Sequence, residues 1–386
     1  MSPESPSPSV RNLPSGAGLV LLDTSSNCLW VYNDSARQIW EQVERGGSSD
    51  DIAADLAGQY GIPEDVARAD VSAILGQWRS QGLVRANGAR PPASQAAAPI
   101  VTDWKSQPEP RWGASFTVTI RSKVFALAIE PAQIAEFIRV AFQHLVTPQA
   151  RPHVCMQVRL ANDGERALIV DGTERTRMRE DSQVMGAVDQ VVLEHLYPGI
   201  EWLALMHGGG IARGGAGFAV PAACGSGKTT LIAYLIANKG FTYIADDLIA
   251  LATDGRLVPW PMPLGPKEGS WKLLSEWYPY LLTAPNYRTQ LGEARQILPP
   301  PDAWDTEPVP LRGFIFPRYV AGADAKLTRL TALEALQRLL GDRVWLGYPM
   351  TEQRVSAFLA RLEDMPAYSL VHGNVAEAAH LLDDIA

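Results

Sequence analysis

Cysteine is scarce in this chain of 386 residues, which contains only Cys28, Cys155 and Cys224. An odd number of widely spaced cysteines does not form a disulfide framework, and it suits a reducing compartment. Long apolar runs are lacking too, since none approaches the roughly 18 residues that a membrane-spanning helix needs. The first residues, MSPESPSPSV, have neither the basic start nor the apolar stretch of a signal peptide. These absences predict a soluble, cytoplasmic protein that has no membrane partner.

An excess of basic charge is also missing. The chain has 34 Lys and Arg against 42 Asp and Glu, which gives a formal net charge of -8. This balance argues against a broad surface that neutralises phosphates, so we expect no nucleic-acid partner. Hydrophobic residues at 46% and charged residues at 20% are close to globular averages. The composition therefore predicts a folded protein, and the length favours two or three domains.

Two stretches rich in proline and small residues divide the chain. Residues 1–14 offer almost nothing to bury, and we expect a disordered tail there. Residues 87–112 combine prolines with small side chains, which is typical of a linker. A compact unit at 15–86 lies between these stretches, and a long region at 113–386 follows them.

The compact unit has the pattern of a hairpin followed by three helices. Apolar residues alternate on both sides of the turn-forming run at 23–27, which predicts a β-hairpin. The residues expected to begin or end the helices are Asn33 or Asp34, Ser48 or Ser49, Gly61 and Pro63. The pattern predicts a small α+β domain of winged-helix character.

One segment of the long region, GFAVPAACGSGKTT at 217–230, has the pattern of a phosphate-binding loop. A short apolar strand leads through small residues into an amphipathic helix. Small residues let backbone N–H groups converge on phosphate oxygens, and the start of the helix adds positive potential. We expect Lys228 to contact the β- and γ-phosphates of a nucleotide, and Thr229 to offer its hydroxyl to Mg²⁺. The expected nucleotide-binding residues are Cys224, Gly225, Ser226, Gly227, Lys228, Thr229 and Thr230.

The segment departs from the full phosphate-loop pattern at Ala222, where that pattern has glycine. A Cβ atom there restricts backbone angles that glycine reaches freely. From the motif alone, a glycine-rich turn with a solvated lysine is the alternative. The context favours the nucleotide site, because Gly240 ends the helix and a second apolar strand runs into Asp246 and Asp247. Carboxylates at a strand end beside a phosphate loop are where a metal ion and a general base are needed.

Met206-His207-Gly208, CGSGKTT and IADD together resemble the C-terminal kinase domain of HPr serine kinase. They resemble still more closely the HPr-kinase-related proteins found beside peptide-modification genes in bacteria. The resemblance covers about 113–386 and is strongest over 200–272. It implies an α/β, P-loop kinase fold of the kind shared with phosphoenolpyruvate carboxykinase, with ATP as the phosphoryl donor.

The same resemblance implies roles for individual residues. Asp247 would take the proton of the acceptor hydroxyl, with His207 beside it and Lys228 on the phosphates. Thr229, Asp246 and Glu268 would hold Mg²⁺ directly or through water. Without the resemblance, a lone histidine such as His207 is more often structural, and a lone glutamate such as Glu268 is usually only solvated.

The compact unit, with LLDTSSNCLWVY at its start, resembles a PqqD-type domain, the leader-recognition fold of ribosomal peptide biosynthesis. The resemblance implies that an extended peptide adds to the edge strand near 27–32. The residues that it implies for peptide binding are Cys28, Leu29, Trp30, Val31, Ile74 and Trp78. The alternative is a small winged-helix domain that packs on the kinase or binds DNA. Acidic residues outnumber basic ones in 1–90, which argues against DNA.

Taken together, these patterns predict an ATP-dependent kinase that phosphorylates a Ser or Thr hydroxyl of a ribosomally made precursor peptide. The PqqD-like domain would capture that peptide, and other peptide-modification enzymes are further candidate partners. Three alternatives stay open: an ATP-binding peptide chaperone or regulator that transfers nothing, a kinase of HPr itself, and a kinase of a small-molecule hydroxyl. The sequence also leaves open the identity of the acceptor and whether the chain forms a homo-oligomer.

Overall fold

The structure is a computed structural model of the chain. It describes residues 4–16, 18–26, 28–86, 104, 110–148, 150–161, 163–289, 292–304, 307–341, 344–346 and 350–385. The chain divides into two compact units, one formed by residues 1–100 with 329–368 and the other by 101–328 with 369–386. The expectation of one continuous region from 113 to 386 was therefore wrong. A segment near the C-terminus packs with the N-terminal residues, and no local sequence pattern predicts such a long-range contact.

The predicted tail at 1–14 is also corrected. Within it, β1 (Glu4–Pro6) pairs with β5 (Val84–Ala86), and β2 (Val10–Leu13) joins the main sheet of the first unit. The apolar ends of β2 are buried, which a composition averaged over fourteen residues conceals. The predicted linker at 87–112 lies mostly outside the described residues. Within it, Trp104 packs on the Arg159 guanidinium and donates to Glu174.

The hairpin and the three helices predicted for the first unit are confirmed. Its remaining elements are β3 (Leu19–Asp23), β4 (Cys28–Tyr32), α1 (Asp34–Glu44), α2 (Ser49–Tyr60), α3 (Glu64–Ser80), α8 (Ala332–Leu340), β21 (Val344–Leu346) and α9 (Glu352–Asp364). The side chains of Asn33 and Ser48 accept from backbone N–H groups at the starts of α1 and α2. Gly61 ends α2 in the left-handed conformation that favours glycine.

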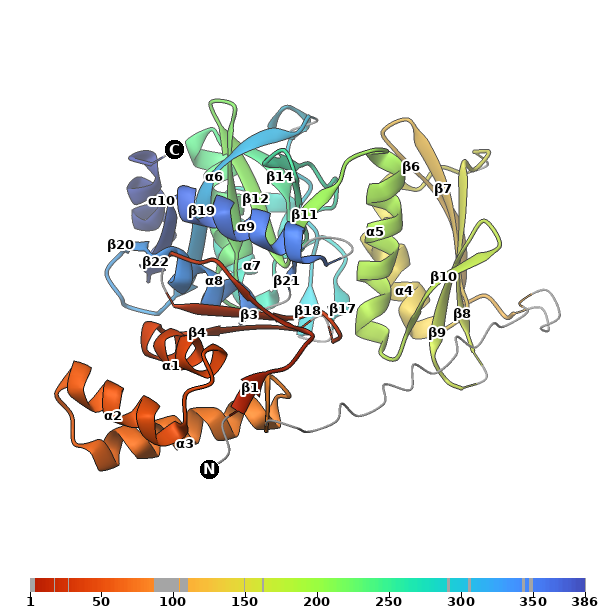
Figure 1. Cartoon of the computed structure of the whole chain (residues 1–386). Helices are drawn as coiled ribbons and strands as arrows, with labels where there is room; N and C mark the ends of the chain where they lie inside the picture. The colour runs from red at the N-terminus through yellow and green to blue at the C-terminus, as the bar shows by residue number, and fades with distance from the viewer. Residues whose placement is uncertain are drawn as a thin grey trace. The chain divides into compact units, whose positions relative to one another are not determined.

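The three-stranded sheet β2-β3-β4 is covered on both faces by helices of its own unit (Figure 1). On one face, Leu19 and Leu21 belong to a core that includes side chains of α1, α2 and α3. On the opposite face, Val20 and Leu22 are also fully buried. Here α8 contacts β4 and α9 contacts β2. We call the first the α1–α3 face and the second the α8–α9 face.

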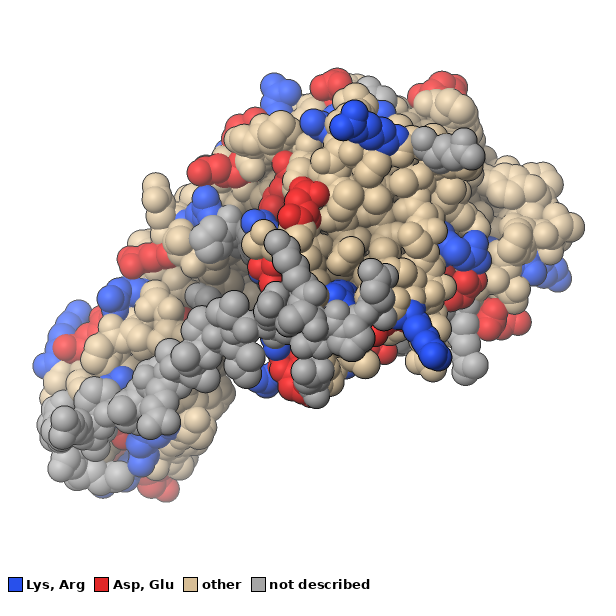
Figure 2. Space-filling model, turned by 90° about the vertical axis from the view of Figure 1, so that its right-hand side faces the viewer, with Lys and Arg blue, Asp and Glu red and all other residues tan. Residues whose placement is uncertain are grey.

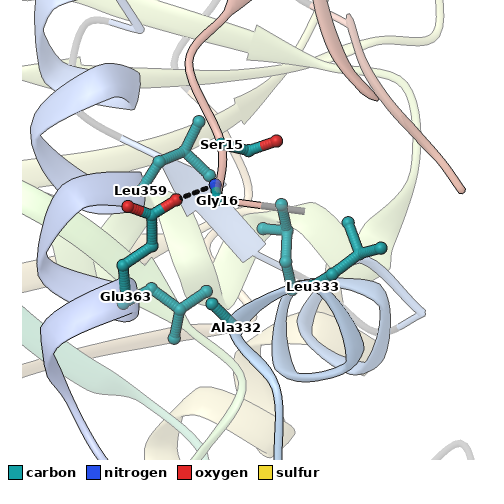
Figure 3. Close-up of a pocket in the computed structure, with 8 residues that line it drawn as sticks. Ser15, Gly16, Ala332, Leu333, Leu359 and Glu363 are labelled. Carbon is teal, nitrogen blue, oxygen red and sulfur yellow. Dashed lines mark hydrogen bonds between the residues drawn. The ribbon is translucent and has the colours of Figure 1, made fainter. Parts of the chain in front are cut away.

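Several contacts join the N-terminal strands to α8 and α9. Arg11 of β2 forms an ion pair with Glu352 at 3.6 Å, and the Gly16 N–H donates to the Glu363 carboxylate. Figure 3 shows this region, a hollow between the Ser15–Gly16 segment and the two helices, into which Leu333 and Leu359 project. The two C-terminal helices are therefore an integral layer of the first unit.

Among the described residues, the second unit contains two large sheets and a two-stranded sheet of β17 (Tyr287–Thr289) and β18 (Gly292–Ala294). The first has the order β10-β9-β8-β7-β6 and packs against α4 and α5. Its elements are β6 (Ala114–Ile120), β7 (Lys123–Ile129), α4 (Ala132–Ala141), β8 (Val154–Leu160), β9 (Arg166–Val170), β10 (Thr173–Met178) and α5 (Val184–Leu196).

The second sheet runs in the order β14-β12-β13-β19-β16-β15-β11 within this unit. Its elements are β11 (Trp202–Met206), β12 (Gly208–Arg213), β13 (Ala216–Pro221), β14 (Thr242–Ala245), β15 (Ile249–Ala252), β16 (Arg256–Val258) and β19 (Val309–Tyr319). The helices α6 (Lys228–Lys239) and α10 (Val375–Asp383) pack on each other in a core that includes β12 and β13 side chains. Strand β13 lies parallel to β19 and antiparallel to β12, and β14 pairs with β12.

Strand β20 (Lys326–Leu330) pairs with β22 (Ala367–His372), and β22 also pairs with β19. The chain leaves the second unit within β20 and returns to it within β22. Among the described residues, no helix combines the length and the apolar character that crossing a membrane requires. On the face shown in Figure 2, basic and acidic side chains are interspersed.

Candidate functional site

A loop at 222–227, which we call the glycine loop, connects β13 to α6 in the second unit. Gly225 and Gly227 both have φ of 86°, a conformation that glycine adopts at no steric cost. Among the described residues, positive φ outside glycine occurs only at Arg121, Asp171 and Asp247. Ala222 is therefore in an ordinary backbone conformation. The loop turns without needing the left-handed freedom of glycine at that position.

Helix α6 begins at Lys228 directly after the loop. Its first turn contains no acidic residue, and Gly227 caps it without a side chain. The free N–H groups of a helix start and the positive end of the helix dipole together favour an anion. Gly240 ends the helix in the left-handed conformation with φ of 65°, as predicted. The strand, loop and helix thus form a local setting that suits a phosphate group.

Strand β12 can lie close to β13 and α6, the two elements that flank this loop, because it begins with three glycines. A Cβ atom at Gly208 would stand 2.7 Å from the Pro221 Cα and 2.8 Å from the Val220 backbone oxygen. A Cβ atom at Gly209 would overlap the end of the Ile232 side chain in α6. The glycine run therefore fixes the distance between β12, β13 and α6. It also sets the position of His207, which directly precedes β12.

We expect the substitution Gly208→Ala to lower the free energy of unfolding by about 1–3 kcal/mol, because the added methyl group must displace backbone rather than a flexible side chain. Urea unfolding followed by circular dichroism would measure this change. The matched control is Gly186→Ala in α5, where a Cβ atom would meet nothing within 4 Å. That variant should be neutral or up to about 1 kcal/mol more stable, since alanine favours helix. Equal effects of the two variants would contradict the packing argument.

Lys228 lies at the centre of the site, with its side chain only 6% exposed. Its ammonium nitrogen is 2.9 Å from Asp246 Oδ1 and 3.2 Å from Asp247 Oδ1. Burial alone lowers the pKa of a lysine, but the charges of Asp246 and Asp247 outweigh it and raise the pKa of Lys228 above its ordinary value. Lys228 is therefore a fixed cation at the start of α6.

Asp246 is the buried partner of this pair, at 2% exposure. Its Oδ2 accepts from the Thr229 hydroxyl at 3.1 Å and from the Gly265 N–H at 3.3 Å. Burial raises the pKa of Asp246, and the lysine lowers it only in part. The structure therefore brings together two residues predicted to hold Mg²⁺, Thr229 and Asp246.

Asp247 has the opposite character, because its side chain is 75% exposed. Desolvation by the surrounding protein raises the pKa of Asp247, but the charges of Lys228 and then of His207 lower it more, to well below the usual range. The His207 Nε2 lies 3.6 Å from its Oδ1. The backbone of Asp247 has φ of 64°, a strained conformation of the kind that clusters at functional sites. Asp247 is thus an ionised, accessible carboxylate in a fixed position.

Two further polar groups near this site were missed by the sequence reasoning. Asp189 in α5 is 7% exposed, its Oδ1 has no hydrogen-bond partner, and burial together with the Asp247 charge raises its pKa well above normal. Tyr287 has its hydroxyl 3.2 Å from the position that a Gly265 Cβ would take, and burial and both site aspartates raise its pKa. Asp189 could have been noticed in the sequence, because it is an acidic residue between the valines of an apolar helix. The sequence around Tyr287 contains no pattern that indicates a place near this site.

A histidine also lies against the glycine loop. His372 at the end of β22 is 2% exposed, and its Nε2 would be 3.8 Å from a Cβ atom at Gly227. Its ring meets the Tyr319 ring edge-on with centroids 5.9 Å apart, and the Tyr319 N–H donates to the Ser226 carbonyl at 2.8 Å. Burial lowers the pKa of His372. The loop is therefore supported from this side by an aromatic pair.

The remaining predicted residues occupy the edges of the site. Cys224 is exposed and accepts from the Lys267 ammonium, which belongs to the residue capping α7 (Glu268–Leu274). Glu268 is exposed at the first position of that short helix. Within the described part of the chain, no three His, Cys, Asp or Glu side chains gather into a metal-binding group. Glu268 is therefore not joined to Asp246 and Asp247 in such a group.

The candidate peptide site lies in the first unit, at β4. In the sheet order β2-β3-β4, this strand is an edge strand among the described residues. Leu29 and Val31 are half-buried on the α8–α9 face, while Trp30 packs against the α1–α3 core and Cys28 is exposed. An open strand edge of this kind offers backbone donors and acceptors to an added strand.

Of the two residues expected from α3, only one is available at the surface of that core. Ile74 is half-buried and packs at its border. Trp78 is fully buried, with its ring edge-on to Tyr32 at 5.8 Å and to Trp40 at 5.2 Å between centroids. The expectation that Trp78 contacts a peptide was therefore wrong. It belongs to the same apolar stripe as Ile74 but points into the centre of the domain.

Comparison with known proteins gives a match for the first unit. Residues 18–84 match the family PqqD, described as coenzyme PQQ synthesis protein D. No curated protein matches the chain. Among solved structures, "Lasso peptide synthetase B1 complexed with the leader peptide" is 26% identical, covers 22% of this chain and 98% of its own, and has a TM-score of 0.21. "TbiB1 in Complex with the TbiA(beta) Leader Peptide" is 17% identical over 22% of this chain and 99% of its own, also with a TM-score of 0.21. The family match at 18–84 shows that the N-terminal part of the chain is PqqD-like.

Proposed function

We propose that this chain captures a segment of a ribosomally made precursor peptide on β4 and transfers a phosphoryl group from ATP to a hydroxyl side chain of that peptide. The main support for phosphoryl transfer is the arrangement at the start of α6. There, Lys228 forms a buried ion pair with Asp246 and also contacts the exposed Asp247. The resemblance of this segment to HPr-kinase-related proteins supports the same assignment. The PqqD match at 18–84 supports the peptide as the acceptor.

The start of α6 and Lys228 would bind the phosphates. Backbone N–H groups after Gly225 and the ammonium group of Lys228 would stabilise negative charge on the transferring phosphoryl group. The lysine is held by two carboxylates, so its position is fixed before a nucleotide arrives. A preorganised charge does not need to be rearranged at the moment of reaction.

The residues present fit a magnesium ion. Thr229 and Asp246 offer oxygen atoms next to each other, and Mg²⁺ in phosphoryl-transfer sites is bound by one or two carboxylates together with substrate phosphates. These two residues would hold the ion, and Glu268 is not needed for that set. When bound, the ion supplies positive charge to the phosphate oxygens.

Asp247 would accept the proton of the acceptor hydroxyl. It is exposed, so a substrate can reach it, and its low pKa keeps it ionised at neutral pH. His207 at 3.6 Å and Lys228 at 3.2 Å would hold its carboxylate in one orientation. A group placed in this way can orient the attacking oxygen as well as remove its proton.

The test begins with peptides captured from a cell extract of the source organism on the immobilised full chain. Captured peptides are incubated with radiolabelled ATP and Mg²⁺ and examined by mass spectrometry. We expect a phosphate on a Ser or Thr side chain, and we expect Asp247→Asn to reduce the rate by roughly 100-fold or more, as for loss of a general base. The matched control is Asp254→Asn, an exposed aspartate near Arg256 that should transfer at the normal rate.

The outcomes separate the proposal from its alternatives. A peptide that binds together with ATP but is never phosphorylated would favour the alternative function, an ATP-binding peptide chaperone or regulator. Phosphate appearing on a small molecule of the extract, and on no peptide, would favour the small-molecule kinase. Full transfer by Asp247→Asn would overturn the assigned base.

A further inference from the structure

The edge of β4 is bordered by a helix on each face of the sheet. On the α1–α3 face, Ile74 of α3 lies at the border of the core that Trp30 also contacts. On the α8–α9 face, α8 contacts β4, and Leu333 lies 2.8 Å from the position of a Cβ atom at Gly18, beside the last residue of β4. Thus a strand added to β4 meets protein on both of its faces.

The surface of α8 suits this role. Leu336 is buried, whereas Leu333 and Leu340 are only half-buried. These two leucines are seven positions apart, so they lie on the same side of the helix, two turns from each other. On the sheet, Leu29 and Val31 of β4 continue the apolar surface on that face.

We propose that α8 forms the second wall of the peptide site, so that the added segment is enclosed on both faces and has a near-continuous apolar run. This inference rests on the proposed capture of a peptide at β4. Side chains of a strand point alternately to opposite faces. A strand covered on one face needs an apolar residue at every second position, whereas a strand covered on both faces reads as an unbroken apolar run. The partner is therefore a peptide with about four to six consecutive apolar residues in its recognised segment.

The test uses the full chain and a phage-displayed library of random twelve-residue peptides. Peptides selected on the wild-type chain should have apolar residues at both odd and even positions of the bound segment. The variants Leu333→Ser and Leu340→Ser should each weaken the best selected peptide by roughly 10-fold, as expected for a side chain that loses apolar contact. The control Leu160→Ser changes an exposed leucine of the second unit and should bind normally.

A comparison of the two walls makes the test sharper. Ile74→Ser should relax the apolar preference at one set of alternate positions, and Leu333→Ser should relax it at the other set. Circular dichroism and urea unfolding of each variant separate a lost contact from a lost fold. Selected peptides that are apolar only at every second position, and that bind Leu333→Ser and Leu340→Ser as tightly as wild type, would overturn the role of α8 while leaving strand addition intact. Failure to select any peptide would instead count against the proposed peptide capture itself.

Discussion

A fragment that ends at Ala86 is expected to be unfolded or aggregated, although it contains the whole segment that matches PqqD. In the full chain, Leu13, Val20 and Leu22 are at most 2% exposed on the α8–α9 face, and the fragment would leave them without α8 and α9. Each such side chain contributes about 1.5–3 kcal/mol by burial, so three of them contribute about 4.5–9 kcal/mol. A typical domain has a total stability of about 5–15 kcal/mol. The stabilisation lost with α8 and α9 is therefore comparable to the total stability of a typical domain.

The matched experiment compares residues 1–86 with residues 1–86 joined through a flexible linker to 329–368. We expect a cooperative urea transition, followed by circular dichroism, only for the joined form. A third form, in which Val20 and Leu22 of the short fragment are changed to Thr, should be more soluble than the short fragment, because less apolar surface is exposed. If the short fragment unfolded with the same midpoint as the joined form, the helices α8 and α9 would not be required.

The substitution Lys228→Met should have the second large effect, and it should be visible without any substrate. Removal of the ammonium group leaves the buried Asp246 without its counter-ion, and breaking a buried pair in this way costs about 3–5 kcal/mol. Phosphate transfer should also be lost. Because the pKa of Asp246 is already raised by burial, loss of the lysine raises it further in the folded state.

This raised pKa gives the stability effect of Lys228→Met a pH signature. A carboxyl group whose pKa is higher in the folded than in the unfolded state favours folding at low pH and opposes it as pH rises. The deficit in unfolding free energy should therefore be largest at neutral pH and smaller in acid, as measured by urea unfolding across pH. The control is Lys239→Met at the other end of α6, which pairs with Asp383 near the surface and should change stability by about 1 kcal/mol or less. Similar losses in both variants would contradict the buried pair.

Features that depend on neighbouring residues could be predicted from the sequence. The caps at Asn33 and Ser48 and the left-handed ends at Gly61 and Gly240 follow from the chemistry of single residues, and the structure confirms them. The strand, loop and helix around Lys228 were predictable for the same reason, and the place of Asp246 at the end of the following strand was expected from the phosphate-loop pattern. The kinase assignment for this site stays a proposal.

Features that depend on distant parts of the chain could not be predicted. Helical spacing marks both Ile74 and Trp78 as apolar positions, but only tertiary packing decides that Trp78 lies between Tyr32 and Trp40. The amphipathic pattern of α8 predicts a buried face without naming the sheet that buries it. Asp189 in α5 differs from these, because an acidic residue within an apolar helix could be noticed in the sequence. Its proximity to Asp247 could not be predicted, because the two residues are far apart in the chain.

The contact between Gly16 and Glu363 joins residues 347 positions apart in the sequence, and it has a consequence for synthesis on the ribosome. At roughly 5–20 residues per second, the ribosome needs about 20–70 s after making the first strands to produce α9. During that interval, one apolar face of the nascent sheet has no native cover. The N-terminal unit therefore cannot complete its fold before α9 has been synthesised, and we expect a nascent-chain chaperone to occupy that face until then.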